Sequence, residues 1–159
     1  MTQTSNRLYK LRDVMRRNEI YCCFLTKPEN IYYFSNFYPT SPAFLIIPYE
    51  HEPKIVVTSI DSKRAGEETN FDVIEAKVDI IEESREELAK TRIKTSKGLF
   101  STAKNLLKKI LFSYVGIEED FLSVGMLRNF KIKRYRDISL EIAKLRSIKD
   151  LNEIDRIKK

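Results

Sequence analysis

A short aromatic stretch between two apolar runs constrains the fold of this chain more than any other feature. Residues 28–38 read Pro-Glu-Asn-Ile-Tyr-Tyr-Phe-Ser-Asn-Phe-Tyr, and five of these eleven residues are aromatic in a chain that is 11% aromatic overall. The flanking runs, 20–25 and 43–47, are apolar and have the length of strands. The connection between them must pack under a sheet or line a pocket, because water would otherwise meet a large hydrophobic patch.

The composition predicts a soluble protein of one domain, or of one domain and the start of another. The 159 residues are 42% hydrophobic and 33% charged, which provides a core and a solvated surface. The chain has no run near the roughly 18 apolar residues that span a bilayer and no secretory signal core, so we expect no membrane partner. Cys22 and Cys23 are adjacent in an apolar run and are interpreted as buried hydrophobes in a reducing compartment, which predicts the cytoplasm.

The net charge of +6 raises the question of a nucleic-acid partner. Lys and Arg alternate with Glu and Asp along most of the chain, as in residues 62–68. The densest basic stretch, 131–136, alternates with apolar residues and is interpreted as the entry to a strand. We therefore expect a solvated surface with excess lysine and no nucleic-acid partner.

Residue periodicity predicts strands that alternate with helices. A first helix capped by Ser5 carries an apolar stripe of helical period. Further helices are predicted over 61–68, over 80–90, and from Leu99 to Ile110 after an interruption at Gly98. A helix capped by Ser123 is expected to turn Val124, Leu127 and Phe130 inward, and another extends from a cap at Ser139 to Arg146. Strands are predicted at 20–25, 43–47, 54–58, 71–76, 111–117 and 135–138. The second and third strands form a hairpin, so the fold class is α/β: a mixed, mostly parallel-crossover sheet of about six strands, with helices on both faces.

The last residues predict a helix that needs a partner. Asp150 and Glu153 have the spacing of a capping box, and Leu151, Ile154 and Ile157 form an apolar stripe. A helix of about ten residues is marginal alone in water. The stripe either docks on this domain or packs against a partner outside this chain, and we expect the second: a downstream domain that is not part of this chain.

The single histidine does not predict a metal site. His51 lies between Glu50 and Glu52 in a predicted turn, where neighbouring side chains point in different directions and do not converge on an ion. The sequence also has no glycine-rich phosphate loop, nucleophile elbow or Cys–His pairing. We expect no catalytic residue, metal or cofactor in this chain.

Four motifs occur in an order that resembles the N-terminal domain of the creatinase–prolidase–aminopeptidase P family, the "pita-bread" Xaa-Pro peptidases. They are Arg7-Leu8-x-x-Leu11-Arg12-x-x-Met15, Pro28-x-Asn30-Ile31-x-Tyr33-Phe34-Ser35-x-Phe37, Val115-Gly116-Ile117-Glu118 and Leu145-Arg146-x-Ile148-Lys149-x-x-x-Glu153-Ile154. Family members usually have Gly where this chain has Asn36. Asn is the residue that best replaces Gly at positive φ, so the turn is expected to survive.

The resemblance implies a ribonuclease H-like domain over residues 1–145, followed by a linker helix, 146–159, that leads to an absent C-terminal catalytic domain. That domain would hold two divalent metal ions (manganese, cobalt or zinc) and cleave peptide bonds before proline. The N-terminal domain would support a homodimer and lend loop residues to the rim of a substrate pocket. The matching residues are Phe37, Tyr38, Thr40 and Ser41, with simple packing against the first helix as the alternative. Tyr32, Tyr33 and Phe34 are expected in the core.

Two other functions remain open at this point. Related domains occur in catalytically inactive proteins that bind other proteins, including a histone chaperone, so a protein-binding module is the alternative. A nuclease is a weaker hypothesis, because it needs clustered acidic residues, and Asp61, Asp72 and Asp137 are scattered in the predicted topology.

Overall fold

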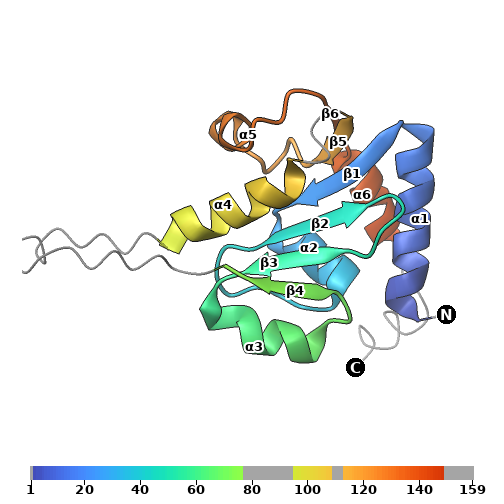
Figure 1. The fold of residues 1–159 in the computed structure, drawn as a ribbon. Helices are drawn as coiled ribbons and strands as arrows, with labels where there is room; N and C mark the ends of the chain where they lie inside the picture. The colour runs from blue at the N-terminus through green and yellow to red at the C-terminus, as the bar shows by residue number, and fades with distance from the viewer. Residues whose placement is uncertain (1, 77–94, 109–112, 149–159) are drawn as a thin grey trace, which may run out of the picture.

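The computed structural model describes residues 2–76, 95–108 and 113–148, and its centre is a six-stranded sheet in the order β4-β3-β2-β1-β5-β6 (Figure 1). The strands are β1 (Ile20–Leu25), β2 (Phe44–Pro48), β3 (Lys54–Val57), β4 (Asp72–Glu75), β5 (Tyr114–Ile117) and β6 (Tyr135–Asp137). The predicted number of strands and the predicted hairpin are confirmed, since β2 and β3 are antiparallel neighbours.

Strand direction places most of the strands' carboxyl ends along one edge of the sheet, which we call the carboxyl edge. β2 runs antiparallel to β1 and β3, whereas the β1–β5, β5–β6 and β3–β4 pairs are parallel. All strands except β2 therefore point the same way, and the segments that follow β1, β3, β5 and β6 leave from one edge. In open sheets with parallel strands, this carboxyl edge is where functional residues usually gather.

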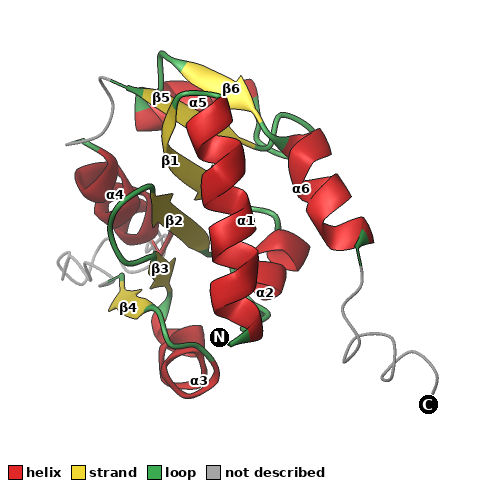
Figure 2. Ribbon diagram, turned by 90° about the vertical axis from the view of Figure 1, so that its right-hand side faces the viewer, coloured by secondary structure: helices red, strands yellow, loops and turns green. Residues whose placement is uncertain are grey.

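Helices cover both faces of the sheet, as predicted. One face is covered by α1 (Gln3–Arg17), α2 (Pro28–Ser35), α3 (Ser59–Glu68) and α6 (Ser139–Ser147), and the other by α4 (Thr95–Leu107) and α5 (Val124–Phe130). Figure 2 shows α1, α2 and α6 on one side of the sheet and α4 on the other. β1 is buried between the two layers, with only Tyr21 exposed along its length, as its continuous apolar sequence predicts. None of the described helices has both the length and the apolarity needed to cross a membrane.

The ends of several helices differ from the prediction. α1 begins at Gln3 and is capped by Thr2, whose side chain accepts a hydrogen bond from the Ser5 backbone, so Ser5 lies inside the helix. α6 has Ile138 as its N-cap, and Ser139 is the first helical residue. Thr and Ser are both good caps, so the pattern alone does not choose between neighbouring candidates.

Two other expectations were wrong, and some fall outside the described residues. Gly98 lies within α4 and does not interrupt it. Val124 is 63% exposed, because α5 is only two turns long and turns Phe130 inward from its other end. The helices predicted at 80–90 and 150–159, Ile110, and residues 111 and 112 of the fifth predicted strand lie outside the described residues.

Gly116 allows β5 to lie close to its neighbours. A Cβ atom at this position would lie 3.1 Å from both Cys23 Sγ and Ile138 Cδ1, and 3.3 Å from Ile20 Cδ1. These distances are shorter than ordinary packing contacts, so the absent side chain lets the start of α6 pack onto the sheet beside β1.

Candidate functional site

The aromatic stretch, which the sequence marks only as a connection between two strands, forms a short helix. Residues Pro28–Ser35 form α2, with Pro in the first turn, where its missing N–H costs no hydrogen bond. Asn36 ends the helix in the left-handed conformation, at φ 62°, so the prediction that Asn preserves this turn is confirmed. Its side chain also donates a hydrogen bond of 3.0 Å to Thr4 Oγ1, which joins the turn to α1.

The residues predicted for a pocket rim divide into two kinds. Phe37 is fully buried in the core beneath α1 and α2, whereas Tyr38 is 46% exposed and Thr40 lies at the surface. Tyr32 was expected in the core but is 44% exposed, and its ring makes an edge contact with that of Tyr38 at 6.2 Å between centroids. Tyr33 and Phe34 are buried, as expected.

Asp61 of α3 holds the segment 37–41 in place. Its buried carboxylate accepts hydrogen bonds from the backbone N–H groups of Thr40 and Ser41, both at 2.9 Å, and from their hydroxyls at 2.6 and 2.8 Å. Arg64, one turn later in α3, donates to Asp61 at 2.9 Å and to the carbonyl of Tyr38 at 2.8 Å, and its guanidinium lies over the Phe37 ring. The segment is therefore fixed by both its backbone and its side chains.

The environment of Asp61 favours the ionised carboxylate. Burial opposes ionisation, but the hydrogen bonds from Thr40, Arg64 and Ser41 outweigh it and hold the pKa of Asp61 well below its usual range. Asp61 is thus a fixed anion at physiological pH. Its donors, Thr40, Ser41 and Arg64, fix the 37–41 segment to α3, which indicates a structural role for the carboxylate itself.

A second buried carboxylate, Glu118, lies at the carboxyl end of β5. It accepts hydrogen bonds from the backbone N–H groups of Thr26 at 2.7 Å and Lys27 at 3.0 Å, and from Asn30 Nδ2 at 2.6 Å. Asn30 in turn accepts a hydrogen bond of 2.9 Å from Arg146 in the last turn of α6. Glu118 therefore connects the end of β5 to the start of α2 and, through Asn30, to α6.

Burial raises the pKa of Glu118 above its ordinary value, although the hydrogen bonds from Thr26, Asn30 and Lys27 partly offset this effect. The two buried carboxylates at this edge of the sheet are therefore shifted in opposite directions. Asp61 has Arg64 and two hydroxyls beside it, whereas Glu118 has neutral donors and is fully enclosed.

All four sequence motifs meet around α2. Arg7 of the first motif donates to the carbonyl of Tyr33 at 2.6 Å and lies over its ring. The hydroxyl of Tyr33 donates to the carbonyl of Leu145 at 3.0 Å, and Asn30 contacts both Glu118 and Arg146. The motifs thus describe one packing arrangement that holds α6, the last described element, against the domain.

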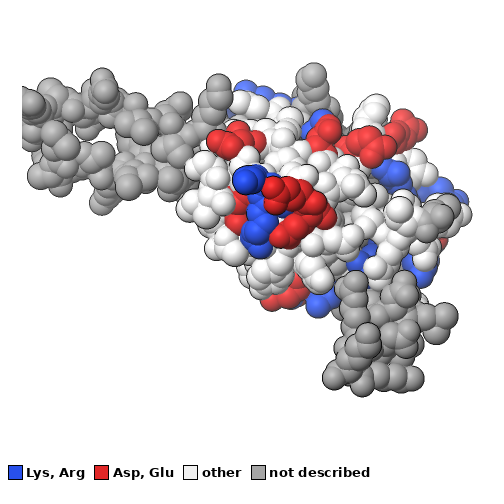
Figure 3. Space-filling model, turned by 90° about the horizontal axis from the view of Figure 1, so that it is seen from below, with Lys and Arg blue, Asp and Glu red and all other residues white. Residues whose placement is uncertain are grey.

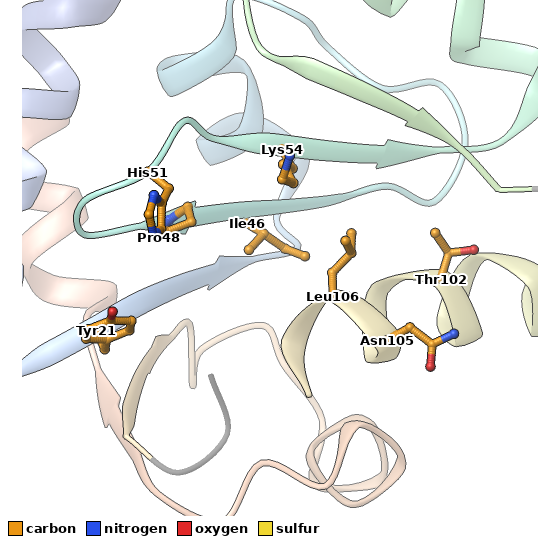
Figure 4. Close-up of a pocket in the computed structure, with 8 residues that line it drawn as sticks. All are labelled: Tyr21, Ile46, Pro48, His51, Lys54, Thr102, Asn105 and Leu106. Carbon is orange, nitrogen blue, oxygen red and sulfur yellow. The ribbon is translucent and has the colours of Figure 1, made fainter. Parts of the chain in front are cut away.

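The structure also contains a cavity of about 630 Å³ on the opposite face, between β1, the β2–β3 hairpin and α4 (Figure 4). Its lining includes the apolar side chains of Tyr21, Ile46, Pro48 and Leu106, with His51 and Lys54 on the hairpin. Lys54 is already paired with Asp72 at 2.8 Å. None of the predicted rim residues lines this cavity.

The described residues contain no group of three or more His, Cys, Asp or Glu side chains that could hold a metal ion. His51 lies in the hairpin turn and is exposed. Asp61, Asp72 and Asp137 bond to different partners: the 37–41 segment, Lys54 and Ser139, respectively. They do not form the acidic cluster that a nuclease would need.

Comparison with known proteins adds the decisive observation. The sequence matches the creatinase/prolidase N-terminal domain family over residues 7–148. The chain belongs to this family. It is 31% identical over 157 residues to the Xaa-Pro dipeptidase of Pyrococcus furiosus, and the match covers 96% of this chain but only 38% of that protein.

Solved structures of relatives share this creatinase/prolidase N-terminal fold. The prolidase from Pyrococcus furiosus has a TM-score of 0.70 and 27% identity, over 93% of this chain and 40% of that one. The X-Pro aminopeptidase from Thermotoga maritima has a TM-score of 0.73 at 19% identity, over 95% and 38%. A proline dipeptidase structure from Streptococcus pneumoniae has a TM-score of 0.68 at 19% identity and is covered over 98% of its length, with 89% of this chain.

Sequence reasoning found the family motifs of this creatinase/prolidase domain but missed what Asp61, Arg64 and Asn30 do. Arg64 appeared only within the predicted helix 61–68, and Asp61 only there and among the scattered acidic residues, because a partner twenty residues earlier leaves no periodic signal. Asn30 and Glu118 were noticed within motifs, yet their contact joins residues 88 positions apart. The available signal was Asn30 itself. An Asn within an apolar stretch is expected to be buried, and a buried amide needs hydrogen-bond partners.

Proposed function

We propose that this chain is the non-catalytic N-terminal domain of a metal-dependent Xaa-Pro peptidase, and that the complete protein hydrolyses peptide bonds that precede proline. The match to 38% of an Xaa-Pro dipeptidase, over 96% of this chain, is the observation that carries the proposal. Residues 1–145 form the accessory domain in this proposal, and residues 146–159 are the linker to a C-terminal catalytic domain. That domain is this chain's principal partner.

The chemistry is assigned to the other domain. A pair of divalent ions such as manganese, cobalt or zinc needs several converging carboxylates and histidines. Among the described residues, the buried carboxylates Asp61 and Glu118 are occupied by donors from their own chain and do not fit such a site. The metal ions would therefore be bound entirely by residues outside the part described.

The proposed contribution of this domain is a rigid rim for the substrate pocket, in its own subunit or in the partner subunit of a homodimer. The exposed ring of Tyr38 and the neighbouring Thr40 are the groups available to contact a proline-containing peptide. Phe37 and Ser41 support them from below, through the core and through Asp61. A rim fixed in advance loses little conformational entropy when a peptide binds.

We also propose a cytoplasmic location. Cys22 and Cys23 are both free and buried, and burial raises the pKa of Cys22 to about 12. Such thiols are inert structural side chains, which suits a compartment where cysteines stay reduced.

The first experiment compares this chain with the protein extended by its downstream coding sequence. Both are assayed with a Xaa-Pro dipeptide in the presence of Mn²⁺ or Co²⁺. We expect turnover only by the extended protein. Turnover by the 159 residues alone would refute the assignment of the chemistry, and an extended protein that binds proteins but never cleaves would favour the binding module.

The second experiment tests the rim in the extended protein. Tyr38→Ala should raise KM several-fold with a smaller change in kcat, because the ring helps to bind the substrate away from the reacting bond. Tyr9→Ala is the control, since Tyr9 is an exposed tyrosine on α1, 68% accessible. Equal kinetic effects of the two substitutions would contradict the rim role.

A further inference from the structure

The basic residues of this domain are not evenly distributed over its surface. Residues 121–136 contain five Lys or Arg residues and no Asp or Glu, so this stretch alone accounts for nearly all of the net charge of +6. By contrast, basic and acidic side chains lie next to each other on the face that carries α3 (Figure 3). This region includes the stretch 131–136, which the sequence already marks as its densest basic segment.

Four of these cations form what we call the basic surface: Arg128, Lys131, Lys133 and Arg134. All four side chains are exposed, and none forms an ion pair with a described residue. By contrast, Arg16 and Arg17 pair with Asp13, Lys27 with Asp120 and Lys54 with Asp72. Exposed cations that have no acidic partner among the described residues create a local positive potential, which favours an anionic partner.

The backbone presents these cations in a fixed arrangement. Lys131 ends α5 in the left-handed conformation, at φ 58°, and the N–H of Ile132 donates to the carbonyl of Leu127 at 3.1 Å. This helix end directs Ile132 into the core beside Phe130, while Lys131 and Lys133 stay outside. α4, which contacts α5, carries Lys104 and is followed directly by Lys108, and no acidic residue occurs between Thr95 and Lys108.

An exposed aromatic ring borders the basic surface. Tyr135 pairs with Val115 in the parallel β5–β6 register, so the two side chains lie on the same face of the sheet. Val115 packs in the core cluster that includes Phe130 of α5, which places Tyr135 on the α5 face, where it is 39% exposed. Cations together with an accessible ring are the features that bind the phosphates and the bases of an unpaired strand.

We propose that the basic surface binds single-stranded nucleic acid, with Arg128, Lys131, Lys133 and Arg134 contacting phosphates and Tyr135 stacking on a base. A protein partner fits less well, because interface cores are depleted in lysine, and two of the four cations are lysines. A duplex fits less well because the cations surround a helix end and a short edge strand, with no long helix to enter a groove. This inference is independent of the proposed peptidase function.

The test is the fluorescence anisotropy of a labelled 20-nucleotide oligouridylate titrated with the 159-residue protein. Four phosphate contacts on a single strand predict an affinity that falls by about 50-fold between 50 and 200 mM salt. The quadruple variant Arg128→Gln, Lys131→Gln, Lys133→Gln, Arg134→Gln should lose most of this salt dependence and bind at least about tenfold more weakly at 50 mM. Circular dichroism establishes that each variant is folded.

A matched variant separates local from overall charge. Lys10→Gln, Arg17→Gln, Lys63→Gln and Lys144→Gln together remove the same charge from α1, α3 and α6, and should leave the affinity within about twofold. Tyr135→Ala should weaken binding by about tenfold without changing the salt dependence, and Tyr135→Phe should restore it.

The proposal is overturned by any of four results. These are no binding at 50 mM salt, equal weakening by the two quadruple variants, no effect of Tyr135→Ala, or tighter binding of a 20-residue polyglutamate peptide or of phosphatidylserine vesicles than of the oligonucleotide. The last result would assign the surface to an acidic protein or to a membrane.

Discussion

Arg146 donates a hydrogen bond of 2.9 Å to the side-chain oxygen of Asn30, a residue 116 positions earlier in the chain. The side-chain amide of Asn30 in turn donates a hydrogen bond of 2.6 Å to Glu118. Three side chains from three different motifs thus hold the last turn of α6 to the start of α2 and the end of β5. In a two-domain protein, such a contact would fix how the next domain begins.

A double-mutant cycle tests whether this contact stabilises the domain. Asn30→Ala and Arg146→Ala, singly and together, should give a coupling of about 1 kcal/mol in urea unfolding, because the bond is partly buried and involves a charged donor. Asp13 and Arg16, an exposed pair on α1, form the control cycle and should show no measurable coupling. Additive effects of Asn30→Ala and Arg146→Ala would show that the hydrogen bond contributes nothing.

Glu118→Gln should destabilise the domain by about 1–3 kcal/mol at neutral pH, because one carbonyl oxygen cannot replace both carboxylate oxygens and leaves a buried donor unpaired. The raised pKa of Glu118 sets the pH dependence. At Glu118 the folded state binds a proton more tightly than the unfolded state. The stabilisation that this proton binding provides is complete below the unfolded pKa and is lost as the pH rises through the folded pKa. The difference between wild type and Glu118→Gln in unfolding free energy should therefore be larger at pH 4 than at pH 8, and the reverse order would contradict the shift.

Asp61→Asn should show the opposite pH dependence. The pKa of Asp61 is depressed in the folded state, so its contribution is present above the unfolded pKa, near 3.8, and is lost as the pH falls through the folded pKa. We expect a loss of about 2 kcal/mol at pH 7 that shrinks below pH 4, measured by urea unfolding across this range. Hydrogen exchange should also show faster exchange of the Thr40 and Ser41 amides in the variant. Unchanged protection of these two amides would show that Asp61 does not hold the segment.

Asn36 tests the left-handed turn after α2. Asn36→Ala should cost about 1–2 kcal/mol, because it combines an unfavourable φ with the loss of the hydrogen bond to Thr4. Asn36→Gly should cost less, since Gly adopts this conformation freely. Glu19, also at positive φ (56°), is the matched site without such a side-chain bond to α1, and Glu19→Gly is expected to be stabilising. Thermal denaturation of the wild type and the three variants distinguishes backbone strain at positive φ from loss of the hydrogen bond to Thr4. Equal melting temperatures for Asn36→Ala and the wild type would refute both effects.

The sheet was predictable because its signals are local. Continuous apolar residues identified β1, and the turn chemistry between β2 and β3 identified the hairpin. The family motifs extended this to the whole fold, since they fixed the order in which helices and strands follow each other. The helix boundaries were less certain, as Thr2 and Ser5 are equally good caps and only packing selects between them.

The candidate site was predictable only in part, because the contacts that build it are distant in sequence. Thr40 and Ser41 were singled out by resemblance, but nothing near them in the chain indicates that Asp61 binds both. Tyr32 was assigned to the core because an aromatic residue in an apolar stretch usually packs inside. The helical period of α2 instead places it outward, toward Tyr38. A stretch described only as a connection between strands gives no period from which to predict this.

The position of β1 between β2 and β5 has a consequence for how the molecule folds. The pairing of β1 with β2, and of β2 with β3, brings together residues close in sequence, whereas pairing with β5 must wait for a segment about ninety residues further on. On a ribosome, the first five elements, α1 to β3, are therefore expected to assemble as a nucleus while the rest of the chain is still being synthesised. Until β5 has been synthesised, the backbone groups of β1 that pair with β5 have no partner. The nascent chain is most prone to aggregate during this interval.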